Sequence, residues 1–279
     1  ILGEAVEKCL ESNSSKSTSH IVFERLKEVR ADFAFVILQR LISSKSAYSG
    51  LRQLFTLTWN TIVQSRFDYD AVFTTESAPY YRTLLKILVL SAQPHLQTPA
   101  GGDAIALAQT FSRSTNAKGL LAQTPLEANL ILEVLDCCVA RGFRSLATAL
   151  HDSSSSSENA SIPSPADFVL LTSLLHTLLS IPGTHTLHTS LTLLFTTTTN
   201  TLRYATALFS HSDRFLTPNN DPVYGSLSLS FLLELSSVLP LAEAMAVDNV
   251  LASLSSANLA EYFLRPAGMG PFDEPARIY

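Results

Sequence analysis

Glycine is scarce in this chain of 279 residues, which contains only 10. Average usage is roughly 7%, so the chain has about half of the usual amount. Loops that hold phosphate groups and tight hairpins need glycine, because it adopts positive φ and lets the backbone approach a ligand closely. The shortage argues against nucleotide-binding α/β folds and β-sandwiches. It favours helices, whose interiors disfavour glycine.

Charged residues are also few: Asp, Glu, Lys and Arg make up 15% of the chain, and the net charge is −5. Nucleic-acid binding depends on clustered lysine and arginine side chains that neutralise phosphates. A chain with so little positive charge carries no dense basic face. The composition therefore predicts no nucleic-acid partner.

Cysteine is limited to Cys9, Cys137 and Cys138. An odd count with two adjacent residues does not match the disulfide framework of a secreted domain, so we expect buried thiols in a reducing compartment. The longest apolar stretches, such as Phe168–Ile181, are shorter than the roughly 20 residues of a transmembrane helix, and no direct membrane span is predicted. No signal peptide is recognised in these residues, and because Ile1 is not a start residue we expect the chain to be a piece of a longer protein.

Leucine, in contrast, is abundant, with 46 residues of 279, and its spacing is helical. The stretch SAPYYRTLLKILVL (77–90) shows the pattern. Pro79 suits a first helical turn, and apolar residues recur from Tyr81 to Ala92 at i, i+3, i+4, i+7 and i+11. This spacing predicts one helix with a continuous apolar face.

Sequence signals mark two other helix starts, at 124–127 (TPLE) and 164–167 (SPAD), where a capping hydroxyl precedes proline and an acidic residue. Gly142 and Pro182-Gly183 are predicted helix stops. The remaining helices are predicted with less sharply marked ends, near 2–12, 19–28, 30–43, 47–65, 69–75, 103–112, 143–151, 185–198, 200–213, 223–238, 240–247, 248–255 and 257–264.

The chain is therefore predicted to be all-α. Phe33–Leu38 and Thr196–Thr199 have the composition of strands, but no hairpin turn or partner strand lies near them, so both are expected to be helical. Successive helices with short connections pack antiparallel, as stacked pairs in an α-solenoid or as a bundle.

The polar residues of 77–90 do not have the spacing of a catalytic motif. One class of dehydrogenases carries Tyr-x-x-x-Lys on a helix, because residues four apart share a face. Tyr81 and Lys86 are five apart, and the residue four before Lys86 is Arg82. We expect Tyr81 to be packed, and Arg82 and Lys86 to share a solvent face.

Metal sites need three or four converging ligands. His176, His185 and His188 have no Asp, Glu or Cys between Asp167 and Asp213 to complete a set. The side chains of Cys137 and Cys138 point about 100° apart on a helix and cannot share an ion. Isoprenoid-type cyclases hold magnesium with an Asp-Asp-x-x-Asp motif, whereas this chain has only Asp68-Tyr69-Asp70. No catalytic residue, cofactor or metal is predicted, and the chain is predicted not to be an enzyme.

Five stretches occur in an order that resembles the C-terminal region of the very large inner-ring scaffold nucleoporins: ERL (24–26), FVILQRL (35–41), LTWNTI (57–62), YYRTLLK (80–86) and VARGFRSLA (139–147). The fungal class named for a mass of 188 kilodaltons is the most similar, and its 192/205-kilodalton sister class is the alternative. The resemblance extends over most of the chain.

That resemblance implies an irregular α-solenoid of HEAT/armadillo-like antiparallel helix pairs. It would span 1–265, with a mobile Ser-rich loop at about 151–164, followed by a Pro-containing tail at 266–279. It also implies a structural role in the nuclear pore complex, at the nuclear envelope. The implied partners are short linear segments of linker nucleoporins, including the Nic96/Nup93-type linker, which dock into solenoid grooves as helices or extended strips.

A candidate partner-binding site lies near the chain end, where Tyr262, Phe263 and Leu264 place three large apolar groups together. The alternative is that the tail, with Met269 and Phe272, folds back and covers them. Two other functions stay open. The first is a karyopherin-like transport or adaptor solenoid that binds Phe-Gly repeats or cargo. The second is an all-helical enzyme, for which every motif tested is lacking.

Overall fold

The computed structural model of the protein describes residues 2–10, 20–43, 51–93, 124–155, 163–181, 184–214 and 223–257. Within these ranges the regular elements are helices, and no strand occurs. The all-α prediction is confirmed. Phe33–Leu38 lies inside a helix, and residues 196–198 are part of a π-helix.

The chain divides into two compact units. Unit 1 comprises residues 1–67, 79–134 and 177–184. Unit 2 comprises residues 68–78, 135–176 and 185–279. Each unit therefore draws on separated parts of the sequence.

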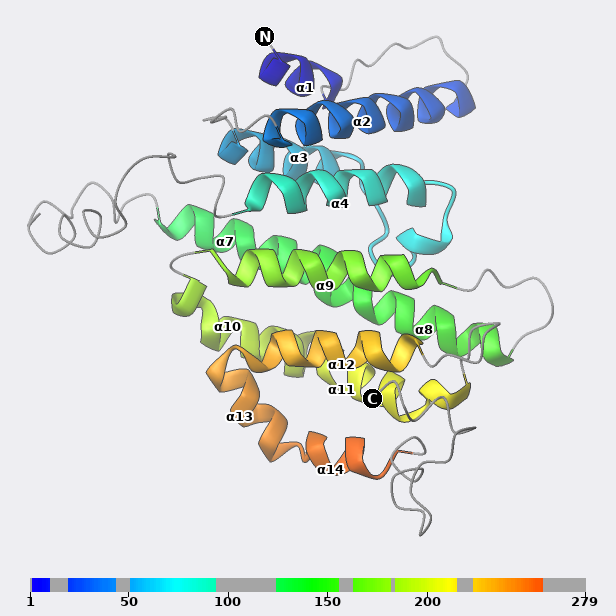
Figure 1. Cartoon of the computed structure of the whole chain (residues 1–279), viewed down its shortest axis with the longest axis vertical. Coiled ribbons are helices and arrows are strands. Elements are labelled where there is room, and N and C mark those ends of the chain that lie inside the picture. Colours follow the sequence, from blue (N-terminus) through cyan, green and yellow to red (C-terminus); the bar gives the residue numbers. More distant parts are fainter. Residues whose placement is uncertain are drawn as a thin grey trace, which may run out of the picture. The chain divides into compact units, whose positions relative to one another are not determined.

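Unit 1 is built from long helices that lie alongside one another (Figure 1). The shortest, α1, contacts both α2 and α3. Its helices are α1 (Leu2–Leu10), α2 (His20–Ser43), α3 (Leu51–Gln64), α4 (Ala78–Ala92) and α7 (Thr124–Val134).

Helix α4 forms where the apolar spacing of 77–90 predicts it. Tyr81, Leu84, Leu85 and Leu88 are fully buried on one face. The ring of Phe67 meets Tyr81 edge-on at 5.0 Å between ring centroids, an arrangement favoured by aromatic quadrupoles. The packed role of Tyr81 is confirmed, and burial of each such leucine stabilises the fold by about 1.5–3 kcal/mol.

The opposite side of α4 is more exposed to solvent, as predicted. Lys86 is exposed, and its ammonium lies 5.7 Å from the centroid of the Phe35 ring on α2. Arg82 is half-buried, so it is less open to solvent than expected.

Polar side chains tie the helices of unit 1 together. The Thr83 hydroxyl on α4 donates to Asp32 on α2 at 2.7 Å. The indole N–H of Trp59 on α3 donates to the Glu133 carboxylate on α7 at 3.3 Å. Arg30 on α2 donates to the carbonyl of Lys8 on α1 at 2.6 Å. The first two bonds join helices that are not consecutive in the sequence, and the third joins the neighbours α1 and α2.

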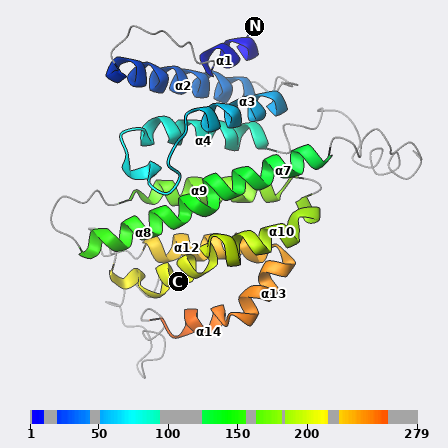
Figure 2. The same ribbon diagram turned by 180° about the vertical axis from the view of Figure 1, so that it is seen from behind.

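Unit 2 contains shorter helices interrupted by 3₁₀ and π segments. Helix α11 contacts α8, α12 and α14, and α13 contacts α10 and α12; Figure 2 shows these helices from behind. The elements are η1 (Val72–Thr74), η2 (Leu135–Ala140, π), α8 (Arg141–Ser155), α9 (Pro165–Leu179, which ends in unit 1), η3 (Thr184–Leu187), α10 (His188–Leu193), η4 (Leu194–Thr198, π), α11 (Thr201–Ser210), η5 (Ser212–Arg214), α12 (Val223–Ser236), α13 (Leu239–Val247) and α14 (Val250–Ser255).

Four phenylalanines form the centre of unit 2, and all are fully buried. Phe143 stacks on Phe231 with ring centroids 4.0 Å apart and meets Phe168 edge-on at 5.4 Å. Phe195 approaches Phe231 edge-on at 6.4 Å. Aromatic pairs of this geometry contribute about 0.5–1.5 kcal/mol each beyond the burial of their area.

The two π segments of unit 2, η2 and η4, contact each other. π geometry displaces carbonyl groups from the ordinary i→i+4 pattern of an α-helix. Buried threonines supply donors at this place: Thr201 donates to the carbonyl of Ala140 at 3.1 Å, and Thr199 to that of Leu194 at 2.8 Å. The hydroxyls of Thr199 and Thr201 also lie 2.6 Å apart. Two carbonyl groups of these irregular turns, those of Ala140 and Leu194, are therefore bonded to threonine hydroxyls.

Several predicted helix ends are wrong. The predicted helices 19–28 and 30–43 are one helix, α2, because no residue near Val29 breaks the backbone pattern. Gly142 does not stop a helix but lies within α8, where a glycine admits close neighbours. The predicted helix 69–75 is a 3₁₀ turn at Val72–Thr74. No helix begins at residue 69, because Asp68 Oδ1 accepts the N–H of Asp70 at 3.1 Å. This local turn competes with helix formation.

The Ser-rich loop was predicted to begin at about 151, but α8 continues to Ser155. Serine is a tolerable helix residue, and the preceding turns already hold the helix direction. The second start signal is confirmed: α9 begins at Pro165, and the hydroxyl of Ser164 accepts the N–H of Ala166 at 3.3 Å.

Other predictions fall outside the described residues. They are the helix at 103–112, almost all of the helix at 257–264, and the tail beyond 265. The boundary between solenoid and tail therefore stays a prediction.

Candidate functional site

The residues tested for catalysis are not brought together. Tyr81 is buried while Lys86 is exposed, so they lie on different faces of α4. Within the ranges that the structure describes, no three His, Cys, Asp or Glu side chains gather as ligands for a metal ion. In the same ranges no single helix is both long and apolar enough to cross a membrane; α12 and α13 reach that length and hydropathy only as a pair, bent by 120°.

The acidic pair Asp68 and Asp70 serves local structure. Asp68 forms the turn described above, and Asp70 accepts a charge-assisted hydrogen bond from Arg144 at 2.5 Å. Arg141 donates to both carboxylate oxygens of Asp136, at 3.3 and 3.4 Å. The hydrogen bond to Asp136 raises the pKa of Arg141. Asp70 and Asp136 are therefore paired with arginines, and Asp68 is engaged in a local turn, so this acidic pair has a structural role.

Tyr69 lies beside these ion pairs. Burial raises the pKa of its phenol, the neighbouring thiols of Cys138 and Cys137 raise it further, and Arg141 lowers it. The phenol is therefore protonated at physiological pH. A group held in its neutral form by burial stabilises packing but is a poor base or nucleophile.

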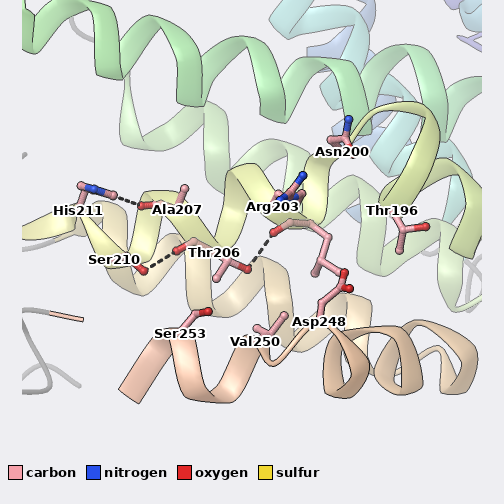
Figure 3. Close-up of a pocket in the computed structure, with 11 residues that line it drawn as sticks. Thr196, Asn200, Arg203, Thr206, Ala207, Ser210, His211, Asp248, Val250 and Ser253 are labelled. Carbon is pink, nitrogen blue, oxygen red and sulfur yellow. Dashed lines mark hydrogen bonds between the residues drawn. The ribbon is translucent and has the colours of Figure 1, made fainter. Parts of the chain in front are cut away.

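Unit 2 contains an open groove of about 720 Å³ between α11 and the α13–α14 pair (Figure 3). Several of its polar groups are bonded within α11: Thr206 donates to Leu202, Ser210 donates to Thr206, and His211 Nδ1 lies 2.9 Å from the carbonyl of Ala207. The groove is lined by Thr196, Asn200, Leu202, Arg203, Thr206, Ala207, Ser210, His211, Asp248, Val250 and Ser253.

Arg203 and Asp248 are the charged residues of the groove, and they form no ion pair with each other or with other described residues. With both charges exposed to water, the groove lacks the desolvation that catalytic sites use to strengthen electrostatics.

Two apolar surfaces were not predicted from the sequence. On α2, a row of side chains at alternating spacings of four and three is about half exposed: Val22, Leu26, Val29, Phe33 and Val36. The opposite side of α2 is buried through Ala31, Ala34 and Leu38. The sequence shows this row as a second apolar stripe of the helix. The spacing of its residues does not tell whether the stripe is exposed or buried.

The second surface lies at the other end of the described chain, on α12, α13 and α14. Its four members are the most exposed large apolar side chains of the described residues: Leu233, Leu239, Val247 and Leu251. The predicted partner-binding residues Tyr262, Phe263 and Leu264 follow in the sequence but lie outside the described residues, so that site stays a prediction.

Helices packed against one another, without a strand in the described residues, are typical of irregular α-solenoid proteins. The family profile described as "Nuclear pore protein NUP188 C-terminal domain" matches residues 54–279, and the chain belongs to this family. It is a nucleoporin, and its location is the nuclear pore complex of the nuclear envelope.

Two relatives support this assignment. Nucleoporin NUP188 of Chaetomium thermophilum is 32% identical in an alignment 292 residues long. That alignment covers 98% of this chain and 14% of that protein. The solved structure "Nup188(aa1445-1827) from Myceliophthora thermophila" is 31% identical, with a TM-score of 0.57, and the match covers 82% of this chain and 54% of that chain. The chain thus spans about one seventh of the curated relative's length. The predicted 188-kilodalton class and the solenoid fold are confirmed.

Proposed function

We propose that this chain is part of a structural scaffold nucleoporin of the inner ring of the nuclear pore complex. In this role it holds short linear segments of linker nucleoporins, the Nic96/Nup93-type linker among them. The observation that carries the proposal is the similarity to a NUP188 nucleoporin along 98% of the chain. The exposed apolar helix faces support it, because linear segments bind such faces through a few buried anchors. The role is structural and includes no catalytic step.

The experiment is isothermal titration calorimetry of the purified chain with synthetic segments of linker nucleoporins. A scaffold holds its linker with a submicromolar Kd, which corresponds to a binding free energy of roughly −8 kcal/mol or better. Phe-Gly repeat peptides, measured in parallel, are expected to bind far more weakly. Tighter binding of the repeats than of the linker segments would favour the transport or adaptor function instead.

We further propose that Tyr262, Phe263 and Leu264 contribute to this binding. Phe263→Glu is expected to weaken linker binding at least tenfold while the melting temperature is kept. Phe263→Tyr, which retains the ring, is the matched control and should bind as the unmodified chain does. A variant that loses only stability would identify Phe263 as a core residue and remove it from the site.

A further inference from the structure

The exposed side of α2 repeats every seven residues. Between residues 25 and 43, every exposed residue falls on three positions of a seven-residue repeat, and the residues between them are buried or half-buried. A straight α-helix has about 3.6 residues per turn, so a side that repeats at about 3.5 is the geometry of a seam with a second helix. The exposed residues are Arg25, Leu26, Val29, Asp32, Phe33, Val36, Gln39, Arg40 and Ser43.

The two inner positions of this repeat are apolar over most of the helix. Val22, Leu26, Val29, Phe33 and Val36 alternate at spacings of four and three and are 50–58% exposed. We call this row the α2 seam; it is about 21 Å long at a rise of about 1.5 Å per residue. Helix α1 has only nine residues and contacts α2 without covering the row. A contiguous exposed apolar row of this length marks an interaction site.

The third exposed position lies beside the α2 seam and carries charges of both signs, Arg25 and Asp32 in successive repeats. Charges at such flanking positions set the partner and the orientation of paired helices. If two copies of α2 lay parallel, Arg25 would face Arg30 of the second copy, and like charges oppose that arrangement. If they lay antiparallel about a two-fold axis, the same flank of each copy would meet, and Arg25 would face Asp32. The charges therefore favour the antiparallel orientation.

Charge also selects one register of the antiparallel pair. When Leu26 is level with Val29 of the second copy, Arg25 lies beside Asp32, and the symmetry forms each contact twice. A shift by one repeat would place Asp32 beside Asp32 of the second copy, where like charges repel. In the favoured register the apolar layers are Val22–Phe33 and Leu26–Val29.

Both charged groups lie at the surface in a state to make this contact. Arg25 forms an ion pair with Glu28 at 2.9 Å, and its side chain is 76% exposed. A guanidinium has five N–H donors, so it can bond a second carboxylate beside the first. Asp32 is exposed, and its Oδ1 accepts the hydroxyl of Thr83 at 2.7 Å, which orients the carboxylate. A carboxylate accepts several hydrogen bonds, so this contact leaves capacity for an arginine.

We propose that two copies of this chain associate along the α2 seam as an antiparallel pair. Leu26 packs against Val29 of the second copy, and Arg25 pairs with Asp32. A single pair of helices buries less than the roughly 1,600 Å² of a standard protein–protein interface, so the dimer is weak, with a Kd of about 1–100 µM. The inference goes beyond the proposed function, whose linker-binding residues are assigned near the chain end.

Two other occupants of the α2 seam are separated from a second copy by the test. One is a helix from another part of the longer protein, because this chain spans 14% of its curated relative. The other is a linker segment. Neither explains why Arg25 and Asp32 of the same helix match each other in a register that also aligns the apolar residues. That match is expected of an isologous contact, in which one patch serves both copies.

The experiment is sedimentation equilibrium of the full chain from about 1 to 200 µM, a range that brackets the expected Kd. The mass is expected to rise from that of a monomer toward that of a dimer. Leu26→Ser/Phe33→Ser should weaken association at least tenfold while the melting temperature at low concentration is kept, since both side chains are half exposed.

The matched control for the seam variant is Leu239→Ser/Leu251→Ser on α13 and α14. It removes two apolar groups that are 67% and 78% exposed and should leave the dimer unchanged. A dimer that is lost in the control and kept in Leu26→Ser/Phe33→Ser would overturn the proposal. So would a chain that stays monomeric over the whole concentration range.

Charge reversal tests the orientation. Arg25→Asp and Asp32→Arg should each weaken the dimer at least threefold, and the double variant should restore it, because the ion pair is remade with its signs exchanged. A double variant as weak as the single ones would overturn the pairing. Tighter association of Arg25→Asp alone would overturn the antiparallel arrangement, since an aspartate there attracts Arg30 of a parallel copy.

Two further outcomes identify the other occupants. A longer form of the protein, extended before Ile1, that is monomeric and is destabilised by Leu26→Ser/Phe33→Ser would overturn the proposal in favour of the preceding residues. Linker segments that bind the unmodified chain but not Leu26→Ser/Phe33→Ser would overturn it in favour of a linker and leave the proposed function standing. Linker binding that is equal in both, with the dimer lost in the variant, supports the two proposals independently.

Discussion

Leu171 of α9 packs directly on Gly142 of α8. A β-carbon at residue 142 would lie 3.2 Å from Cδ1 of Leu171 and 3.3 Å from Cε2 of Phe73. Both neighbours are buried, so neither can move freely into solvent. Glycine therefore lies at the start of α8, directly after the π segment η2, despite its low helical propensity, because its missing side chain allows α9 and the 3₁₀ turn η1 to approach.

Gly142→Ala is expected to destabilise the protein by about 1 kcal/mol in urea denaturation. Overpacking a dense core costs about 1–3 kcal/mol, and the gain in helix propensity offsets about 1 kcal/mol of that. The control is the same change in a Leu171→Ala background, which removes the closer of the two contacts and leaves that of Phe73. Gly142→Ala should then destabilise less; an unchanged loss would show that the contact with Leu171 is not a reason for glycine.

Phe231→Ala is expected to lower the free energy of unfolding by about 3–5 kcal/mol, because it removes a large buried ring and leaves a cavity. The ring also stacks on Phe143, and this pair term is lost. Phe231→Leu, which retains most of the volume, should cost less. Chemical denaturation of both variants measures the difference. Equal and small losses would show that the four phenylalanines are not the centre of unit 2.

Thr201→Val should destabilise by about 1–3 kcal/mol, since it preserves shape but leaves the buried carbonyl of Ala140 without its donor. The matched control is Thr198→Val at the end of η4, three residues earlier, where the residue is exposed and the change is expected to be within about 0.5 kcal/mol. Similar effects at both positions would indicate that the hydroxyl of Thr201 does not hold the π segments.

Tyr69→Phe tests the alkaline behaviour of the fold. Burial raises the pKa of Tyr69 in the folded state above its unfolded value of about 10. Below pH 10 the phenol is protonated in both states, and its contribution to stability is constant. Above pH 10 the unfolded phenol releases its proton first, so stability falls as the pH rises.

The unmodified protein should therefore lose stability above pH 10 more steeply than Tyr69→Phe. Denaturation midpoints measured from pH 8 to 11 give the comparison, with the exposed Tyr204→Phe as the control for loss of a hydroxyl. Parallel curves for the unmodified protein and Tyr69→Phe would contradict the predicted role of this phenol.

The helices with strong local signals could be predicted from the sequence. Helix α4 follows from the spacing of Tyr81, Leu84 and Leu88, and the start of α9 follows from Ser164 and Pro165. In these cases residues within one or two turns determine the outcome. The class of protein was also accessible, because ordered stretches such as YYRTLLK resemble a family.

Features that depend on distant neighbours could not be predicted. Gly142 is a typical stop signal by itself, and only the proximity of Leu171 and Phe73 explains its place inside α8. The π segments depend on donors such as Thr201, 61 residues from Ala140. The exposed row on α2 has the same spacing as a buried one, so its exposure depends on what packs against it.

Trp59, buried and bonded to Glu133, is the only tryptophan of the chain. It belongs to unit 1, and unit 2 contains none. Tryptophan fluorescence, excited selectively, therefore reports on one half of the molecule, while circular dichroism reports on the helices of both. Coincident transitions in the two signals would mean that the halves melt as one cooperative body, and separated transitions would assign each melting step to its half without a label.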